Sequence, residues 1–300
     1  MKRKRNRKQR DRQRHPRKYF LTAVKIFGIL YLTLCLALWH YQSKLIFFPN
    51  KTIRNSPANL GLLYEEVQLP VGNGTAAGKL HGWWIPTLRQ RANQPAPTIL
   101  YLHGNGSNIG DLLNRAAQFH QLGYNILLFD YRGYGLSTGP FPNEQRVYED
   151  AEAAWGYLTT QLNIPANHTI IYGRSLGGAI ALNLATHHPN AAGTITEATF
   201  TTMKDMVTHQ YAFFPFPTRL LLTNHFESLK KVRSLTMPLL FMHGTADKIV
   251  PSYMSQQLHQ AATQTIKKNL LLIESGDHNN LPAIGGDQYA NTIRSFIDNA

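Results

Sequence analysis

The pattern of apolar and polar positions divides this chain into an N-terminal apolar stretch and a long region where strands and helices alternate. Segments with helical spacing lie at 111–122, 144–162, 179–187, 252–262 and 288–299. Apolar runs of strand length lie at 62–69, 79–85, 98–102, 125–129, 169–172, 194–197, 238–242 and 270–273. Near-continuous apolar strands that alternate with helices predict an α/β fold, with a mostly parallel central sheet covered by helices on both faces. The first two strands are expected to form an antiparallel pair.

Residues 198–235 do not follow this alternation. They contain the aromatic and proline-rich stretch 213–217, which is followed by a helical pattern over 218–226. The interval predicts a small cap insertion at about 198–235, above the ends of the strands. An ordinary long crossover that packs on the edge of the sheet is the alternative.

The apolar stretch at 19–41 is long enough to cross a bilayer as a helix. Lys25 is its only charged residue and lies near one end, where its side chain can reach the headgroup region. The aromatic residues Tyr19, Phe20 and Trp39 lie where interfacial anchors are expected. We therefore predict a basic tail at 1–18, a transmembrane signal anchor at 19–41, a connector at 42–61 and one α/β domain at 62–300.

The charge of the chain is concentrated before this stretch. Residues 1–18 hold eleven Lys or Arg and one acid, a net charge of +10 out of +14 for the whole chain. The positive-inside rule then predicts a single-pass membrane protein with a cytoplasmic N-terminus and an extracytoplasmic α/β domain. The basic run lacks the interleaved aromatic residues of a nucleic-acid-binding module, so no nucleic-acid partner is expected.

Three other interpretations fit the apolar stretch less well. A cleaved signal peptide needs a small-x-small site, and residues 36–39 offer a poor one. A twin-arginine export signal would need a second Arg beside Arg17, and a buried helix of a soluble protein would not need the adjoining basic run. The single cysteine, Cys35, lies within the stretch and excludes an intrachain disulfide.

The strand at 169–172 leads into a sharp turn with Ser175 at its apex. Gly173 and Gly177 flank the serine, and small residues such as Ala179 begin the helix that follows. A serine at such a turn adopts a strained conformation, which requires neighbours with almost no side chain. The pattern predicts a nucleophile elbow, although a plain glycine-rich turn would have a similar sequence.

A nucleophilic serine needs a base and an acid that orients the base. Asp247 follows the strand at 238–242, and His278 follows the strand at 270–273, so both are expected at the carboxyl edge of the sheet. The chain order is Ser, Asp, His, which is the order expected for the α/β-hydrolase arrangement. Asp277 and Glu197 are rival acids, but a residue adjacent to the base points its side chain elsewhere.

The expected oxyanion donors are backbone amides. One is the N–H of Leu176, directly after the serine. The second is assigned to Asn105, with Gly106 as the fallback, because the loop at 103–107 follows the strand at 98–102. His103, in the same loop, is expected to brace the turn.

The remaining candidates have structural interpretations. His81, His187, His188 and His243 have no nearby acids at the spacing of a metal site, so neither a metal nor an organic cofactor is expected. The glycine-rich run at 130–135 lacks the order of a nucleotide-binding loop and is expected to border the pocket instead.

Taken together, the motifs HGNGSN, DYRGYGLSTG, GRSLGG, HGTADKIVP and GDHNNLP resemble those of the α/β-hydrolase superfamily. Within it, residues 44–297 are similar to the membrane-anchored abhydrolase-domain proteins, which include depalmitoylase-like serine hydrolases and are related to the prolyl oligopeptidase group. The resemblance implies Ser175 as nucleophile, Asp247 as acid and His278 as base. Related members have cysteine-rich, lipidated N-termini, whereas this chain has a basic run and one apolar segment.

We therefore expect a serine hydrolase that cleaves acyl esters or thioesters of a small-molecule or lipid-like substrate. The stretch 213–217 would supply an apolar pocket for the acyl group. The alternatives are a serine peptidase related to prolyl oligopeptidase and a non-catalytic scaffold tethered to the membrane. The oligomeric state does not follow from the sequence.

Overall fold

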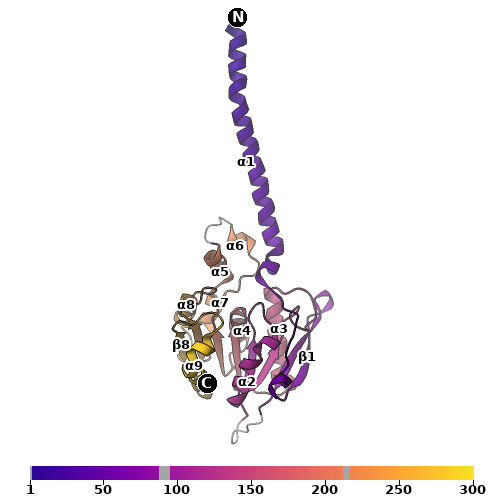
Figure 1. Cartoon of the computed structure of the whole chain (residues 1–300), viewed down its shortest axis with the longest axis vertical. Coiled ribbons are helices and arrows are strands. Elements are labelled where there is room, and N and C mark those ends of the chain that lie inside the picture. The colour runs from indigo at the N-terminus through magenta and orange to yellow at the C-terminus, as the bar shows by residue number, and fades with distance from the viewer. Residues whose placement is uncertain (1, 88–94, 212–216) are drawn as a thin grey trace. The chain divides into compact units, whose positions relative to one another are not determined.

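The computed structural model describes residues 2–87, 95–211 and 217–300, with side chains from Lys18 onward. The chain forms two compact units, one of residues 1–42 and 214–223 and a larger one of residues 43–213 and 224–300. Figure 1 shows the elements of both. Most of the aromatic stretch expected to form an acyl pocket, residues 213–216, lies outside the described residues.

A mixed sheet organises the larger unit. The strands are β1 (Glu65–Val71), β2 (Gly78–Ile85), β3 (Thr98–Leu102), β4 (Asn125–Phe129), β5 (Thr169–Arg174), β6 (Gly193–Glu197), β7 (Leu239–Gly244) and β8 (Lys268–Ile273). Their order across the sheet is β1-β2-β4-β3-β5-β6-β7-β8. The pairs of β2 with β1 and with β4 are antiparallel, and all others are parallel. This confirms the predicted α/β fold with a mostly parallel sheet.

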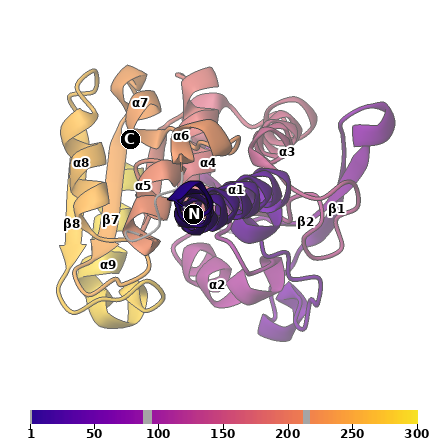
Figure 2. The same cartoon turned by 90° about the horizontal axis from the view of Figure 1, so that it is seen from above.

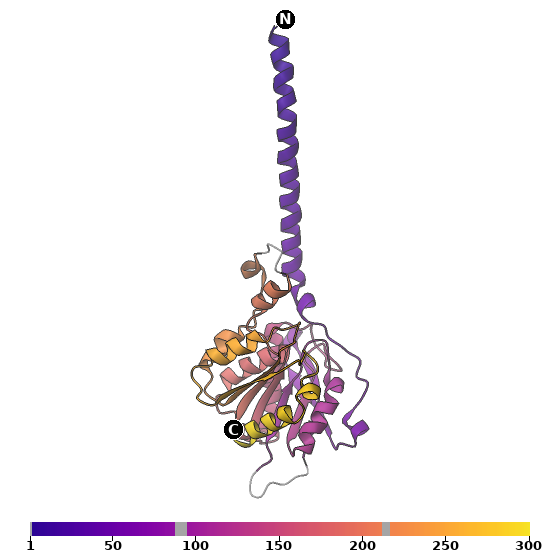
Figure 3. The same ribbon diagram turned by 60° about the vertical axis from the view of Figure 1, so that its left-hand side comes forward.

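Helices cover both faces of the sheet. The elements concerned are α2 (Leu113–Gln121), α3 (Glu144–Gly156), α4 (Leu176–His187), α8 (Tyr253–Ala261) and α9 (Leu281–Asp298). Figures 2 and 3 show α2 and α9 on one face, and α3, α4 and α8 on the other. Alternate residues of each central strand face opposite sides, so Ile99 and Tyr101 of β3 share one core cluster with Phe119 of α2 and Phe296 of α9.

Two helical segments depart from regular α-helical geometry. The helix expected at 144–162 ends at Gly156 and continues as a π-helical turn, Tyr157–Gln161. There the hydroxyl of Thr160 donates to the carbonyl of Gly156 at 2.7 Å, and such local bonds compete with the α-helical pattern. Element α9 (Leu281–Asp298) has a kink at Gly286, with φ 45° and ψ −126°, so a short helical turn with a proline near its start precedes the C-terminal helix that was expected at 288–299.

Short helices occupy the interval that predicted a cap. They are α5 (Met203–Gln210), α6 (Thr218–Leu221), α7 (Ser228–Lys231) and the 3₁₀ turn Val232–Ser234. The described residues of this interval, 198–211 and 217–235, contain no strand. A cap over the site stays a prediction.

Helix α1 (Lys2–Ile46) contains the predicted anchor and extends beyond it at both ends. Its part Lys18–Ile46 is long and apolar enough to cross a membrane, although a signal sequence would have the same properties. Apolar side chains such as Phe20 and Phe27 are exposed. Near its end, Gln42 donates to the carbonyl oxygen of Leu221 at 2.9 Å and accepts from the Thr223 N–H at 2.7 Å, which joins the two segments of the smaller unit.

Gly173→Ala is expected to destabilise the domain. A Cβ at this position would lie 2.2 Å from the carbonyl oxygen of Gly177 and 2.7 Å from the Cβ of Ala181. Such overpacking costs about 1–3 kcal/mol. The control is Gly156→Ala, where an added Cβ meets nothing within 4 Å and helix propensity favours alanine by roughly 0.5–1 kcal/mol. Urea denaturation of both variants measures the difference, and equal midpoints would contradict the packing argument.

Candidate active site

Ser175 lies between β5 and α4 in a strained conformation, with φ 54° and ψ −118°. Its backbone is held on both sides: its N–H donates to the carbonyl of Glu197 at 2.8 Å, and its carbonyl accepts from the Thr199 hydroxyl at 2.9 Å. Glycine is required at 177, where a Cβ would lie 2.0 Å from the carbonyl oxygen of Leu102. The predicted sharp turn is therefore present, and it is fixed by strands β3 and β6.

The structure brings the predicted serine, histidine and aspartate together. The His278 Nε2 lies 3.0 Å from the Ser175 Oγ, and the His278 Nδ1 lies 2.7 Å from the Asp247 Oδ2. Because a carboxylate can only accept, Nδ1 carries the proton and Nε2 is free to accept from the serine hydroxyl. Asp247 and His278 are each 7% exposed, so water competes little for these bonds.

Asp247 is held as an anion by donors around it. The backbone N–H groups of Ile249 and Val250 donate to its Oδ1 at 2.8 and 2.9 Å, and the His243 Nε2 lies 3.1 Å from its Oδ2. Burial alone raises the pKa of Asp247, but the hydrogen bonds from His243 and His278 outweigh it and hold the pKa well below its ordinary value. Asp247 thus stays charged across the physiological range.

His243 contributes more to the site than its structural assignment suggested. Its Nε2 also lies 2.8 Å from the carbonyl of Val250, which can only accept, so this nitrogen carries the proton. Its Nδ1 then accepts from the Ser255 hydroxyl at 2.7 Å. The imidazole therefore presents an N–H to Asp247 in a fixed orientation. In the sequence, the only sign of this contact is the four-residue spacing of His243 and Asp247 in HGTAD.

The loop at 103–107 lies beside Ser175. A Cβ at Gly104 would lie 3.3 Å from the Cβ of Ser175, so a larger residue would press on the serine. In the described parts of the chain, no hydrogen bond occupies the backbone N–H of Leu176 or of Asn105. The Gly106 N–H, by contrast, donates to the Oδ1 of Asn105 at 3.0 Å. Of the two amides considered in this loop, that of Asn105 is the available one.

His103 is fully buried beneath this loop. Its Nδ1 donates to the Gly104 carbonyl at 2.8 Å, and its ring packs on those of Tyr131 and Tyr134, at 4.3 and 5.1 Å between centroids. Burial lowers the pKa of His103 to about 4, so it stays neutral near pH 7. This arrangement agrees with a brace for the turn.

The two rival acids lie elsewhere. Asp277 caps its own turn, where its Oδ1 accepts from the backbone N–H groups of Asn279 and Asn280 at 2.7 and 3.0 Å. Glu197 is 1% exposed and accepts from the hydroxyl of Tyr289 at 2.6 Å, on the face of the sheet covered by α9. Neither carboxylate contacts the His278 ring, in contrast to Asp247.

Glu197 instead anchors a buried charge network that sequence reasoning missed. Its Oε1 lies 3.3 Å from an Arg115 guanidinium nitrogen and 3.5 Å from the Arg174 Nε. Arg174 directly precedes the nucleophile, and its Nη2 donates to the backbone carbonyl of His278 at 2.6 Å and to the Asn279 Oδ1 at 2.7 Å. The carboxylate therefore orients an arginine that holds the loop of the histidine.

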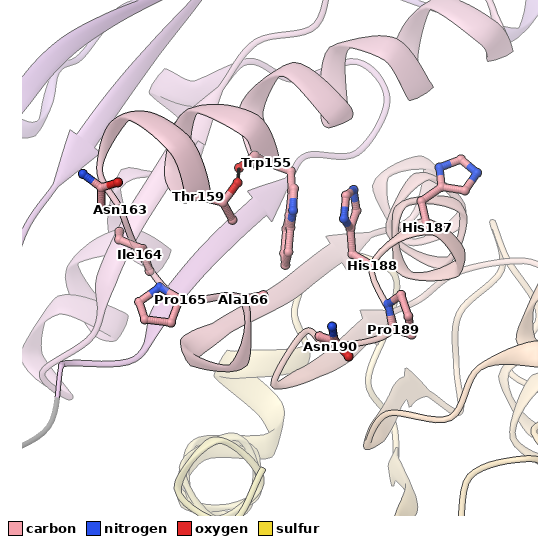
Figure 4. A pocket seen from close by; sticks show the side chains of 10 residues that line it. All are labelled: Trp155, Thr159, Asn163, Ile164, Pro165, Ala166, His187, His188, Pro189 and Asn190. Carbon is pink, nitrogen blue, oxygen red and sulfur yellow. Dashed lines mark hydrogen bonds between the residues drawn. The ribbon is translucent and has the colours of Figure 1, made fainter.

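A separate pocket of about 370 Å³, which none of Ser175, Asp247 and His278 lines, lies between α3, its π-helical turn and the end of α4. Figure 4 shows Trp155 and His188 facing one another there, with ring centroids 4.5 Å apart. His187 and His188 both bond the carboxylate of Glu152, at 2.6 and 2.7 Å. Within the described residues, no group of three or more His, Cys, Asp or Glu is placed to hold a metal ion.

Comparisons with known proteins identify relatives of this chain. A family model described as "Serine aminopeptidase, S33" matches residues 93–230. The chain is 30% identical over 277 residues to the uncharacterized protein Rv2307c of Mycobacterium tuberculosis, covering 92% of this chain and 94% of that protein. It is 29% identical over 277 residues to the alpha/beta hydrolase domain-containing protein WAV2 of Arabidopsis thaliana, covering 86% and 88%.

A solved structure also shares the fold. The esterase Pf2001 of Pyrococcus furiosus superimposes with a TM-score of 0.67 at 19% identity, over 83% of this chain and 98% of that chain. At this level of identity the likeness concerns the fold alone.

Glu197→Gln is expected to lower the free energy of unfolding by about 2–4 kcal/mol, because it leaves two guanidinium groups, whose side chains are 12% and 17% exposed, without their buried counter-charge. The control is Glu227→Gln, whose side chain is 51% exposed and 4.0 Å from Lys230. An exposed pair contributes only about 0–1 kcal/mol. Chemical denaturation measures both, and a Glu197→Gln variant as stable as its control would refute the role of Glu197.

Proposed function

This chain belongs to the α/β-hydrolase superfamily of serine hydrolases, and we propose that it cleaves acyl esters or thioesters through an acyl-enzyme intermediate. The observation that carries the proposal is the line of hydrogen bonds from Ser175 through His278 to Asp247, at 3.0 and 2.7 Å, beginning at a strained serine. A strained polar residue persists only where the surrounding structure fixes it, and it occurs preferentially at functional sites.

In the proposed reaction, the Ser175 Oγ attacks the acyl carbonyl while the His278 Nε2 takes the hydroxyl proton. Asp247 stabilises the imidazolium that forms, and its low pKa keeps the proton on the histidine. The imidazolium then gives the proton to the leaving alcohol or thiol, which departs. A water molecule, deprotonated by the same histidine, releases the acyl group and restores the serine.

The backbone N–H groups of Leu176 and Asn105 are the proposed oxyanion donors. Their availability, and the position of the 103–107 loop beside Ser175, support this assignment. Donors fixed before the reaction stabilise the tetrahedral intermediate without reorganisation, and one such donor is worth a factor of about 10²–10³ in kcat.

A serine peptidase is the second candidate. The matching family model carries the description of a serine aminopeptidase. An amide needs the same nucleophile and base, but protonation of its poorer leaving group is more demanding. A panel of aminoacyl or prolyl amides and p-nitrophenyl esters separates the two: turnover of amides without esters would replace our proposal with a peptidase.

Ser175→Ala is expected to abolish labelling by a fluorophosphonate probe and to lower p-nitrophenyl ester turnover by about 10³-fold or more, because no nucleophile remains. Asp247→Asn is expected to lower kcat by about 10⁴-fold through the wrong imidazole tautomer. Asp277→Asn, which keeps the triad, serves as the control. Labelling of Ser175→Ala equal to that of the wild type would reject the assignment.

We further propose that α1 anchors the protein, with the basic N-terminus in the cytoplasm and the catalytic domain on the other side. The charge distribution of residues 1–18 and the apolar part of α1 support this orientation. Protease added to intact cells or right-side-out vesicles is expected to cut the catalytic domain and to spare the basic tail. Full protection of the domain, with cleavage after detergent, would reverse the orientation.

A further inference from the structure

We propose that the residues at the end of helix α1 and directly after it, Ile46–Phe48, help to position the active site. They would fix, through the side chain of Asn105, the loop whose backbone amide stabilises the oxyanion. This inference rests on the proposed function, and it assigns Asn105 and Ile46–Phe48 a positioning role that the hydrolytic triad does not include.

The first observation is a two-way clamp. The carboxamide nitrogen of Asn105 donates to the carbonyl of Ile46, the last residue of α1, and the backbone N–H of Phe48 donates to the Asn105 Oδ1 at 2.8 Å. The side-chain amide thus pairs with the main chain in the manner of a neighbouring strand. Both bonds must form together, which fixes the orientation of the carboxamide.

The second observation concerns the loop side of the same oxygen. The Asn105 Oδ1 also accepts from the hydroxyl of Tyr134 at 2.8 Å and from the Gly106 N–H at 3.0 Å. Tyr134 is fully buried, and its ring packs on His103 beneath the loop. One oxygen therefore joins the chain that leaves α1, the buried aromatic layer and the loop beside Ser175.

The third observation is that the segment is itself firmly attached. Phe47 is 1% exposed and packs near Phe226, with ring centroids 6.1 Å apart. The carbonyl of Asn50 accepts from the Gly135 N–H at 2.9 Å, and the Asn108 side chain donates to the Thr52 carbonyl at 2.9 Å. A clamp made by a segment that is fixed in this way can hold the loop in place.

The consequence follows from the double use of Asn105. Its backbone N–H is the proposed oxyanion donor, while its side chain is bound to the main chain at 46 and 48. Releasing the side chain lets the peptide plane between Gly104 and Asn105 rotate, and donors act on the oxyanion only when they are aimed at it. A side chain that merely stabilised the fold would affect unfolding and leave the transition state alone.

The test uses the full-length protein with two variants that break the clamp from opposite sides. Asn105→Ala keeps the backbone N–H and removes the carboxamide. Phe48→Pro removes the main-chain donor to Oδ1 without changing any group proposed to touch substrate. Phe48→Ala separates the loss of the exposed ring from the loss of the N–H, and Lys51→Ala is the control within the same segment.

We expect kcat for a p-nitrophenyl ester to fall about 10- to 100-fold in Asn105→Ala and in Phe48→Pro, with KM within about twofold, because the lost interaction acts in the transition state. The Ki of a trifluoromethyl ketone, whose adduct carries an oxyanion, should rise by a similar factor. Phe48→Ala should lose less, and Lys51→Ala should match the wild type. Rates are taken per active site titrated with fluorophosphonate, so that any unfolded fraction is excluded.

Both kcat and Ki within twofold of wild type in the two clamp variants would overturn the inference, even if their unfolding midpoints fall. The proposed function fails in a different way: the wild type itself would then show no labelling that depends on Ser175. An active wild type with unaffected clamp variants therefore rejects only the role of the segment.

Discussion

Crowding of the backbone around Ser175 is the constraint on which the rest of the site depends. The serine is at φ 54°, in a region that costs a non-glycine residue energy, and the strand before it and the helix after it approach within contact distance. An added Cβ at Gly173 or Gly177 would overlap a carbonyl oxygen at 2.2 or 2.0 Å. The elbow is therefore stable only as part of the packed β3–β5–α4 layer, and the layer in turn aims the hydroxyl out of the sheet.

Because the site depends on the packed sheet, the fold and the positions of Ser175, Asp247 and His278 could be predicted from the sequence. Near-continuous apolar strands can only be buried on both faces, which implies a parallel sheet, and in such a sheet the carboxyl ends of β5, β7 and β8 lie at one edge. Candidate residues placed directly after those strands had to meet. The distances of 3.0 and 2.7 Å that join Ser175, His278 and Asp247 follow from that placement.

The supporting residues could not be predicted in the same way, because they meet through side chains from distant elements. Glu197 accepts from Tyr289, 92 positions later in the chain, and no periodicity indicates that contact. The helix expected at 144–162 ends earlier than predicted for a local reason. The hydroxyl of Thr160 donates to a carbonyl that an α-helix would otherwise use. Sequence patterns record which face of an element is buried, whereas these contacts depend on the depth and angle of packing.

The two buried carboxylates, Asp247 and Glu197, have different roles. One is an electrostatic partner of His278, and the other holds the loop of His278 in position. Asp247 accepts from two imidazoles and two main-chain amides, and its charge faces the histidine that becomes a cation in the proposed reaction. Glu197 faces guanidinium groups that do not change charge. Its role is therefore to orient Arg174, which donates to the backbone carbonyl of His278 and holds that loop in place. Separating the two functions lets the histidine change protonation during a reaction while its loop stays where it is. In the proposed oxyanion site, Asn105 shows the same division: its main-chain N–H is available to the reaction, and its side chain holds the position of the loop.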